Sequence, residues 1–97
     1  MQLDIIPEVG DKFFIKEGEG FAFMNKSGGT GLSDWDFNEK YTGPKPHIEI
    51  VHVFYDDEVG YRTWAKAINQ ELIDYMDRVA PPNDKRIFVS QWDLELP

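Results

Sequence analysis

Four short segments of the chain carry apolar residues in patterns that predict β-strands. The first two, Asp11–Glu17 and Gly20–Lys26, are rich in aromatic residues, bounded by glycines and close enough to form a hairpin. His47–Tyr55 is apolar on both faces, so we expect it to be central in the sheet and covered on both sides. Arg86–Leu96 is the last predicted strand. One face of the central strand is expected to carry Ile48, Ile50, His52 and Phe54.

A different apolar spacing, of three and four residues, predicts one long amphipathic helix over Tyr61–Val79. Pro81 and Pro82 end it. The sequence therefore predicts an α+β fold, a small mixed four-stranded sheet in β-β-β-α-β order with the helix packed on one face. The expected apolar stripe of the helix consists of Tyr61, Trp64, Ala65, Ile68, Leu72, Tyr75, Met76 and Val79.

Residues 1–97 are expected to form a single globular domain, because this length is near the commonest domain size. The connection at 27–46 is long for such a domain and is predicted to be a loop or to contain a short helix that begins after Ser33. One helix covers one face of a sheet. The other face is left for this connection, for a second copy of the chain in a homodimer, or for a partner.

The net charge of −8, from 18 acidic and 10 basic residues, restricts the partners that we expect the chain to bind. Such a field repels nucleic acid and anionic lipid and attracts basic surfaces, so we expect no direct nucleic-acid or membrane binding. Acidity that serves only solubility is the alternative. The start of the chain has no signal-peptide pattern and no segment has the apolar length of a membrane span, so we expect a cytoplasmic protein.

Three local motifs suggest chemistry, and each is interpreted here as structural. Residues 20–31, GFAFMNKSGGTG, lack the second glycine of a phosphate loop, which Asn25 replaces, and the following glycines do not begin a helix. His47-Ile48-Glu49 has the H-x-E spacing of zinc deaminases, but the chain has no cysteine to complete that site. His47 and His52 are five residues apart in a predicted strand and should point to opposite faces.

The third motif is the acidic run Asp56-Asp57-Glu58, which lacks the alternating acids and the glycine of an EF-hand. We expect it to lie at the positive end of the following helix. No catalytic set, metal site or cofactor is predicted from these patterns.

The function that the sequence favours is a non-enzymatic, acidic protein-binding module that blocks a basic site on a partner. An inhibitor or immunity-type protein fits this description, and a nucleic-acid mimic used by a phage against host defences is one specific version. Exposed aromatic residues would anchor the partner, since buried rings supply most of the affinity of an interface. The predicted partner face consists of Trp35, Asp56, Asp57, Glu58, Asp74, Asp77, Trp92, Asp93 and Glu95.

Two other functions stay open at this point. A small-molecule-binding domain or small enzyme would have its site between the 27–46 loop and the sheet. A structural subunit of a larger assembly would use the uncovered sheet face as its interface. The lining expected for the small-molecule site consists of Ser33, Asp34, Trp35, Tyr41 and His52.

Overall fold

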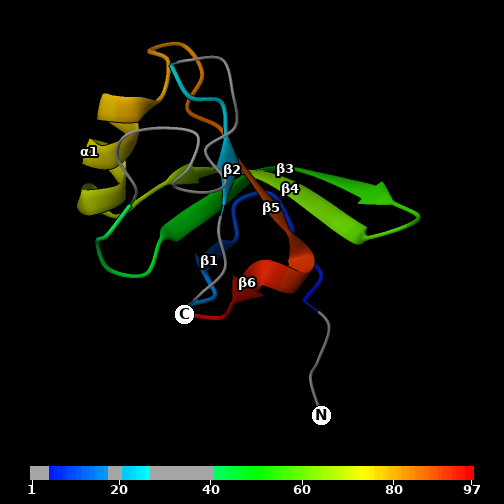
Figure 1. Cartoon of the computed structure of the whole chain (residues 1–97). Coiled ribbons are helices and arrows are strands. Elements are labelled where there is room, and N and C mark those ends of the chain that lie inside the picture. The colour runs from blue at the N-terminus through cyan, green and yellow to red at the C-terminus, as the bar shows by residue number, and fades with distance from the viewer. Residues whose placement is uncertain (1–4, 18–20, 27–40) are drawn as a thin grey trace.

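The computed structural model describes residues 5–17, 21–26 and 41–97. In these residues six strands form one antiparallel sheet that curls into a half-barrel, and a short helix packs at one end of it (Figure 1). The strand order across the sheet is β2-β5-β4-β3-β1-β6. The elements are β1 Lys12–Ile15, β2 Ala22–Phe23, β3 His47–Asp56, β4 Gly60–Ala67, α1 Gln70–Val79, β5 Ile87–Ser90, the 3-10 helix η1 Gln91–Asp93, and β6 Leu94–Glu95.

The predicted fold class is therefore wrong in its main features. The sheet has six antiparallel strands instead of four mixed ones, and the helix has ten residues instead of nineteen. The first half of the predicted helix is instead a strand. Gly60–Ala67 is β4, which pairs with β3 on one side and with β5 on the other. Thr63 and Ala65 are buried while Trp64 between them is not, which is the two-residue period of a strand. The spacing of the apolar residues in this segment fits both a helix and a strand.

The predicted hairpin of the first two strands is also wrong. β1 pairs with β3 and β6, whereas β2 pairs with β5 at the other edge of the sheet. The alternation itself is confirmed in β2 and its flanks, where Phe21, Phe23 and Asn25 are buried. The last predicted strand is divided by η1, because the chain leaves β4 after Ser90 and joins β1 as β6. A strand that changes partners in this way helps to curl the sheet.

The core lies on the inner face of the curled sheet, where α1 covers one end (Figure 1). Ile48 and Ile50 of β3 are fully buried there, and the helix adds Leu72, Tyr75 and Met76. Tyr75 meets the ring of Phe23 edge-on at 6.0 Å, a favoured aromatic geometry. The other core members are Phe13, Ile15, Phe21, Ala65, Ala80, Ile87, Val89 and Leu94.

The helix begins at Gln70, after Asn69, whose backbone is extended and whose side chain does not cap the helix. Its Oδ1 accepts a hydrogen bond from the backbone N–H of His47 at 2.9 Å, which joins the helix start to the start of β3. At the other end Ala80 is extended before Pro81, as a residue before proline prefers. In the part of the chain that the structure describes, no helix has the length and apolar character to cross a membrane.

β3 contains an irregularity that reverses its faces. Ile50 pairs with Ala65 and His52 with Trp64, so Val51 is an extra residue, a β-bulge. Because one inserted residue exchanges the two faces, His52 and Phe54 point outward although Ile48 and Ile50 point into the core. The predicted common face of these residues is wrong for that reason. Only the first half of β3 is covered on its core face; beyond the bulge the strand is largely exposed.

Candidate interaction surface on the β3–β4 hairpin

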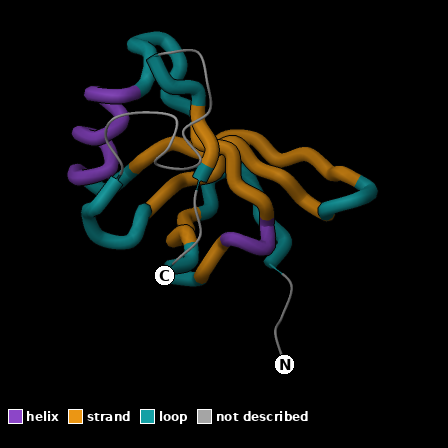
Figure 2. The backbone as a smooth tube through the Cα atoms, in the orientation of Figure 1, coloured by secondary structure: helices purple, strands orange, loops and turns teal. Residues whose placement is uncertain are grey.

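The hairpin formed by β3 and β4 runs on past the rest of the sheet and ends in an acidic turn (Figure 2). Asp56 closes this turn, because its Oδ1 accepts hydrogen bonds from the N–H groups of Glu58 at 2.8 Å and Val59 at 3.4 Å. Gly60 completes it with a positive φ of 86°, which glycine adopts without strain. Asp57 and Glu58 are exposed at the end. The expectation that these acids precede a helix is wrong, since a strand follows them.

The buried side chain of Gln91, in η1, attaches the hairpin to the rest of the molecule. Its Oε1 accepts a hydrogen bond from the N–H of Tyr61 at 2.6 Å, and its Nε2 donates to the carbonyl of Ile5 at 2.8 Å. Gln91 is 6% exposed, so both bonds are sheltered from water. The base of the turn is thereby fixed to η1 and to the segment that precedes β1.

The next residue, Trp92, lies on the turn itself. Its indole Nε1–H donates to the carbonyl of Val59 at 2.6 Å, and its backbone N–H donates to Oγ of Ser90 at 3.3 Å. Trp92 is nonetheless 46% exposed. We call Asp56–Gly60 together with Trp92 the hairpin tip. It is a half-exposed ring held in one orientation beside two exposed carboxylates.

The structure brings together four members of the predicted partner face, Asp56, Asp57, Glu58 and Trp92, and places Asp93 next to them in the chain. Asp93 is half-buried, and its carbonyl accepts the N–H of Lys16 at 2.9 Å.

The remaining members of the predicted partner face are not part of the tip. Asp74 and Asp77 lie on α1, at the other end of the molecule (Figure 1). Asp77 forms an ion pair with Lys85 at 2.6 Å, and Glu95 forms one with Lys45. Trp35 lies outside the described residues.

The outer face of the sheet carries an aromatic cluster that the sequence did not reveal. We call it the outer-face cluster, and its members are His52, Phe54, Arg62, Trp64, Arg86 and Phe88. Trp64 is at its centre, with ring centroids 5.2 Å from His52 and 5.6 Å from Phe88. Cross-strand ring pairs of this kind stabilise adjacent strands by about 0.2–1 kcal/mol each. The cluster therefore stiffens the projecting hairpin from its outer side.

Arginine side chains cover part of this cluster. The guanidinium carbon of Arg86 lies 4.4 Å from the Trp64 ring centroid, and that of Arg62 lies 5.9 Å from the Phe54 centroid. Arg86 also donates from Nε and one terminal nitrogen to the two carboxylate oxygens of Asp84, each at 3.0 Å. These bonds lower the pKa of Asp84 below its ordinary value and raise the pKa of Arg86.

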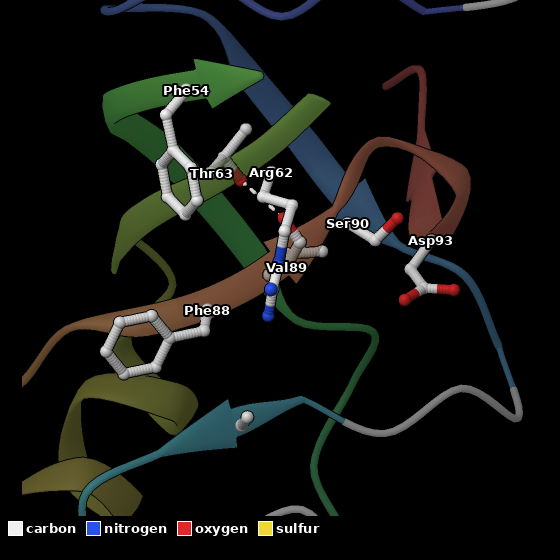
Figure 3. Close-up of a pocket in the computed structure, with 8 residues that line it drawn as sticks. Phe54, Arg62, Thr63, Phe88, Val89, Ser90 and Asp93 are labelled. Atoms are coloured by element: carbon white, nitrogen blue, oxygen red, sulfur yellow. Dashed lines mark hydrogen bonds between the residues drawn. The ribbon is translucent and has the colours of Figure 1, made fainter. Parts of the chain in front are cut away.

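A shallow cleft of about 180 Å³ opens beside the cluster (Figure 3). The rings of Phe54 and Phe88 lie on one side of it, Ser90 and Asp93 lie on the other, and Arg62 extends between them. Ala22, Thr63 and Val89 complete the lining. Ligand pockets commonly measure about 300–1,000 Å³. This cleft is smaller, and it suits a single side chain of a partner better than a metabolite.

The residues proposed to line a small-molecule site do not come together in the described part of the chain. Tyr41 packs on Phe21 and Tyr75 on the core side, at ring distances of 6.2 and 5.4 Å. His52 is on the outer face of the sheet, against Trp64. The sheet therefore separates the two. Ser33, Asp34 and Trp35 lie outside the described residues, as does most of the 27–46 connection.

The two histidines lie on the same face, contrary to the prediction, because the bulge at Val51 lies between them. His47 stacks on Phe14 at 4.4 Å, and its Nε2 is buried without a hydrogen-bond partner among the described residues. Within residues 5–17, 21–26 and 41–97, no group of His, Asp and Glu side chains is arranged to hold a metal ion. The glycines of the 20–31 motif, at 20, 28, 29 and 31, lie outside the described residues.

Sequence reasoning missed Gln91, the outer-face cluster and the true course of residues 60–67. A signal for the hairpin was present, since Gly60 closes the acidic run and Tyr61, Thr63 and Trp64 favour strands. The two bonds of Gln91 had no such signal. They join residues 30 and 86 positions apart.

Comparison with protein-family models, with curated proteins and with solved structures finds no match to this chain.

Proposed function

We propose that this chain is a non-enzymatic, acidic protein-binding module that recognises a basic surface of a partner protein through the hairpin tip. The observation that carries the proposal is the orientation of Trp92. Its indole N–H is bonded to Val59, while the residue remains 46% exposed. A ring fixed before binding loses little conformational entropy on binding, and tryptophan is among the residues that dominate interface affinity.

The charge of the tip supports a basic partner. Asp57 and Glu58 are exposed at the turn, and neither forms an ion pair with a described residue. Binding a cation therefore does not require an existing pair to be broken. A net charge of −8 adds attraction at longer range and speeds the encounter with a basic protein.

The shape of the hairpin supports a blocking role, as in an inhibitor or an immunity-type protein. The hairpin projects beyond the sheet (Figure 2), so it can enter a concave basic site on a partner. The outer-face cluster and the two hydrogen bonds of Gln91 keep it rigid during that step. Blocking of a nucleic-acid-binding site, as by a phage counter-defence protein, is the specific version that we put forward for testing.

The experiment is affinity capture of partners from native cells with the wild-type chain and with two charge-reversal variants. Asp57→Lys with Glu58→Lys changes the tip, and Asp74→Lys with Asp77→Lys is the matched control on α1. We expect the tip variant to lose the partner and the helix variant to retain it. The affinity of the purified pair should fall steeply as salt is raised, because exposed charges are screened.

Trp92 is tested separately, with Trp92→Phe and Trp92→Ala. Trp92→Phe keeps a ring but loses the hydrogen bond to Val59, so it should bind more weakly than wild type and more tightly than Trp92→Ala. Loss of binding in the helix variant together with normal binding in the tip variant would move the interface to α1. An affinity that does not change with salt would exclude recognition by charge.

A further inference from the structure

One edge of the projecting hairpin has no strand beside it among the described residues. β1 covers the edge of β3 only at its beginning, where Phe14 pairs with His47 and Lys12 with Glu49. The last contacts are the N–H of Ile50, which donates to the carbonyl of Asp11 at 2.8 Å, and the Ile50 carbonyl, which accepts from Gly10 at 2.8 Å. The bulge at Val51 follows and breaks the register. Among the described residues, the edge from Val51 to Asp56 is therefore open on the side away from β4.

The backbone groups on this open edge can be identified from the bonds of β4. The N–H of Tyr61 donates to Gln91, on the side away from β3, so Tyr61 and its opposite residue Tyr55 form a non-hydrogen-bonded pair. The N–H and carbonyl of Tyr55 consequently face the open edge. The pattern repeats every second residue, so those of Val53 face it as well. None of these groups is bonded to another backbone group among the described residues.

We propose that an extended basic segment of the partner adds to this edge as a further strand and pairs with Val53 and Tyr55. The inference rests on the proposed function, since it specifies how the same partner would bind. Main-chain hydrogen bonds would supply affinity, and side chains of the added strand would alternate between the two faces of the hairpin. An exposed apolar edge favours such pairing, and Val51 and Tyr55 are 40% and 63% exposed.

Charge at both ends of the edge favours a basic segment over a second copy of this chain. Asp56, Asp57 and Glu58 lie at the turn, and Glu8 and Asp11 lie beside the other end, where β1 begins. A second copy paired in parallel would place the two acidic turns together. Paired antiparallel, it would bring each turn to Glu8 and Asp11 of the other copy. A segment rich in lysine or arginine would lie beside acidic residues of this chain whether it pairs with β3 in the parallel or the antiparallel direction.

The test uses the wild-type chain and a blocked hexapeptide of alternating lysine and valine. Amide hydrogen exchange is followed residue by residue by NMR, with and without the peptide. We expect exchange to slow at Val53 and Tyr55, whose N–H groups become bonded, and to change little at His52 and Phe54, which already face β4. A peptide with N-methylated valines cannot donate the same bonds and should bind about tenfold more weakly, or worse. A peptide with serine in place of lysine tests whether binding requires positive charge.

Variants at Tyr55 provide a second test. Tyr55→Pro removes the outward N–H without removing a bond to β4, and Tyr55→Ala removes the same ring but keeps the N–H. Tyr55 is 63% exposed, so neither change opens the core. We expect Tyr55→Ala to bind the lysine–valine peptide within about threefold of wild type, and Tyr55→Pro to lose it. Should Tyr55→Pro disrupt the hairpin, the exchange measurement on the wild-type chain decides.

The outcomes separate this inference from the function on which it rests. Salt-sensitive peptide binding without slower exchange at Val53 and Tyr55 would overturn strand addition and leave the acidic tip as the binding site. Equal protection by the serine and lysine peptides would overturn the basic partner and keep the edge. Dimerisation of the free chain through the same amides, detected by sedimentation, would show that the occupant is a second copy. Absence of binding by any peptide at millimolar concentration would overturn the inference.

Discussion

Replacement of Gly60 by alanine tests the arrangement that holds the hairpin tip. Gly60 has a φ of 86°, and a Cβ placed on it would collide with Oε1 of Gln91. Two costs follow. A non-glycine residue in the left-handed region loses about 1–2 kcal/mol. Displacement of Gln91 would weaken its bonds to Tyr61 and Ile5, each worth about 0.5–1.5 kcal/mol net. We expect Gly60→Ala to lower the free energy of unfolding by about 2–4 kcal/mol.

Gly10 provides a matched control in the same chain. Its φ is 95°, also in the left-handed region, but a Cβ there would meet no atom within 4 Å. Gly10→Ala should therefore show the backbone cost alone, about 1–2 kcal/mol. The effect of alanine on the unfolded chain is common to both variants and cancels in the comparison. The difference between them isolates the collision with Gln91.

The assay is urea unfolding followed by tryptophan fluorescence, with thermal unfolding as a second measurement. A difference of about 1–2 kcal/mol corresponds to a gap of about 4–16 °C in Tm for a domain of this size. Trp92 follows Gln91 in the chain, so the environment of its indole should change in Gly60→Ala and stay unchanged in Gly10→Ala. Equal destabilisation by the two substitutions would show that Gln91 does not hold the turn.

Three further predictions concern stability. Thr63→Val should cost about 1–2 kcal/mol in urea unfolding, and Thr63→Ser less, because the buried Thr63 hydroxyl donates to a β5 carbonyl at 2.9 Å. Asp84 has a lowered pKa, so its pairing with Arg86 stabilises the fold at pH values above the ordinary pKa of 3.8. This stabilisation is lost as the pH falls through the lowered pKa. Acid unfolding of Asp84→Asn should not show that loss of stability. His47→Phe removes a buried unpaired nitrogen while keeping the stack on Phe14, so calorimetry should show a Tm no lower than that of wild type.

Features that depend on near neighbours in the chain can be predicted from the amino-acid sequence. The apolar run of β3 predicted a strand within one residue of its observed bounds, because it is rich in isoleucine and valine and ends in Phe54 and Tyr55, residue types that favour strands. Pro81 set the end of the helix, since the residue before a proline avoids the helical region. The acidic excess is likewise a property of composition. These features need no knowledge of the rest of the fold.

Features that depend on contacts between distant segments are visible only in the folded chain. Residues 60–67 suit a helix or a strand, and pairing with β3 and β5 on both sides selects the strand. The bulge at Val51 turns His52 and Phe54 outward, and no single residue type marks it. Beyond it, no strand among the described residues pairs with the free edge of β3. Gln91 joins the turn to Ile5 across 86 positions. The candidate site depends on these long-range contacts, and local residue preferences carry no information about contacts made only when the whole chain has folded.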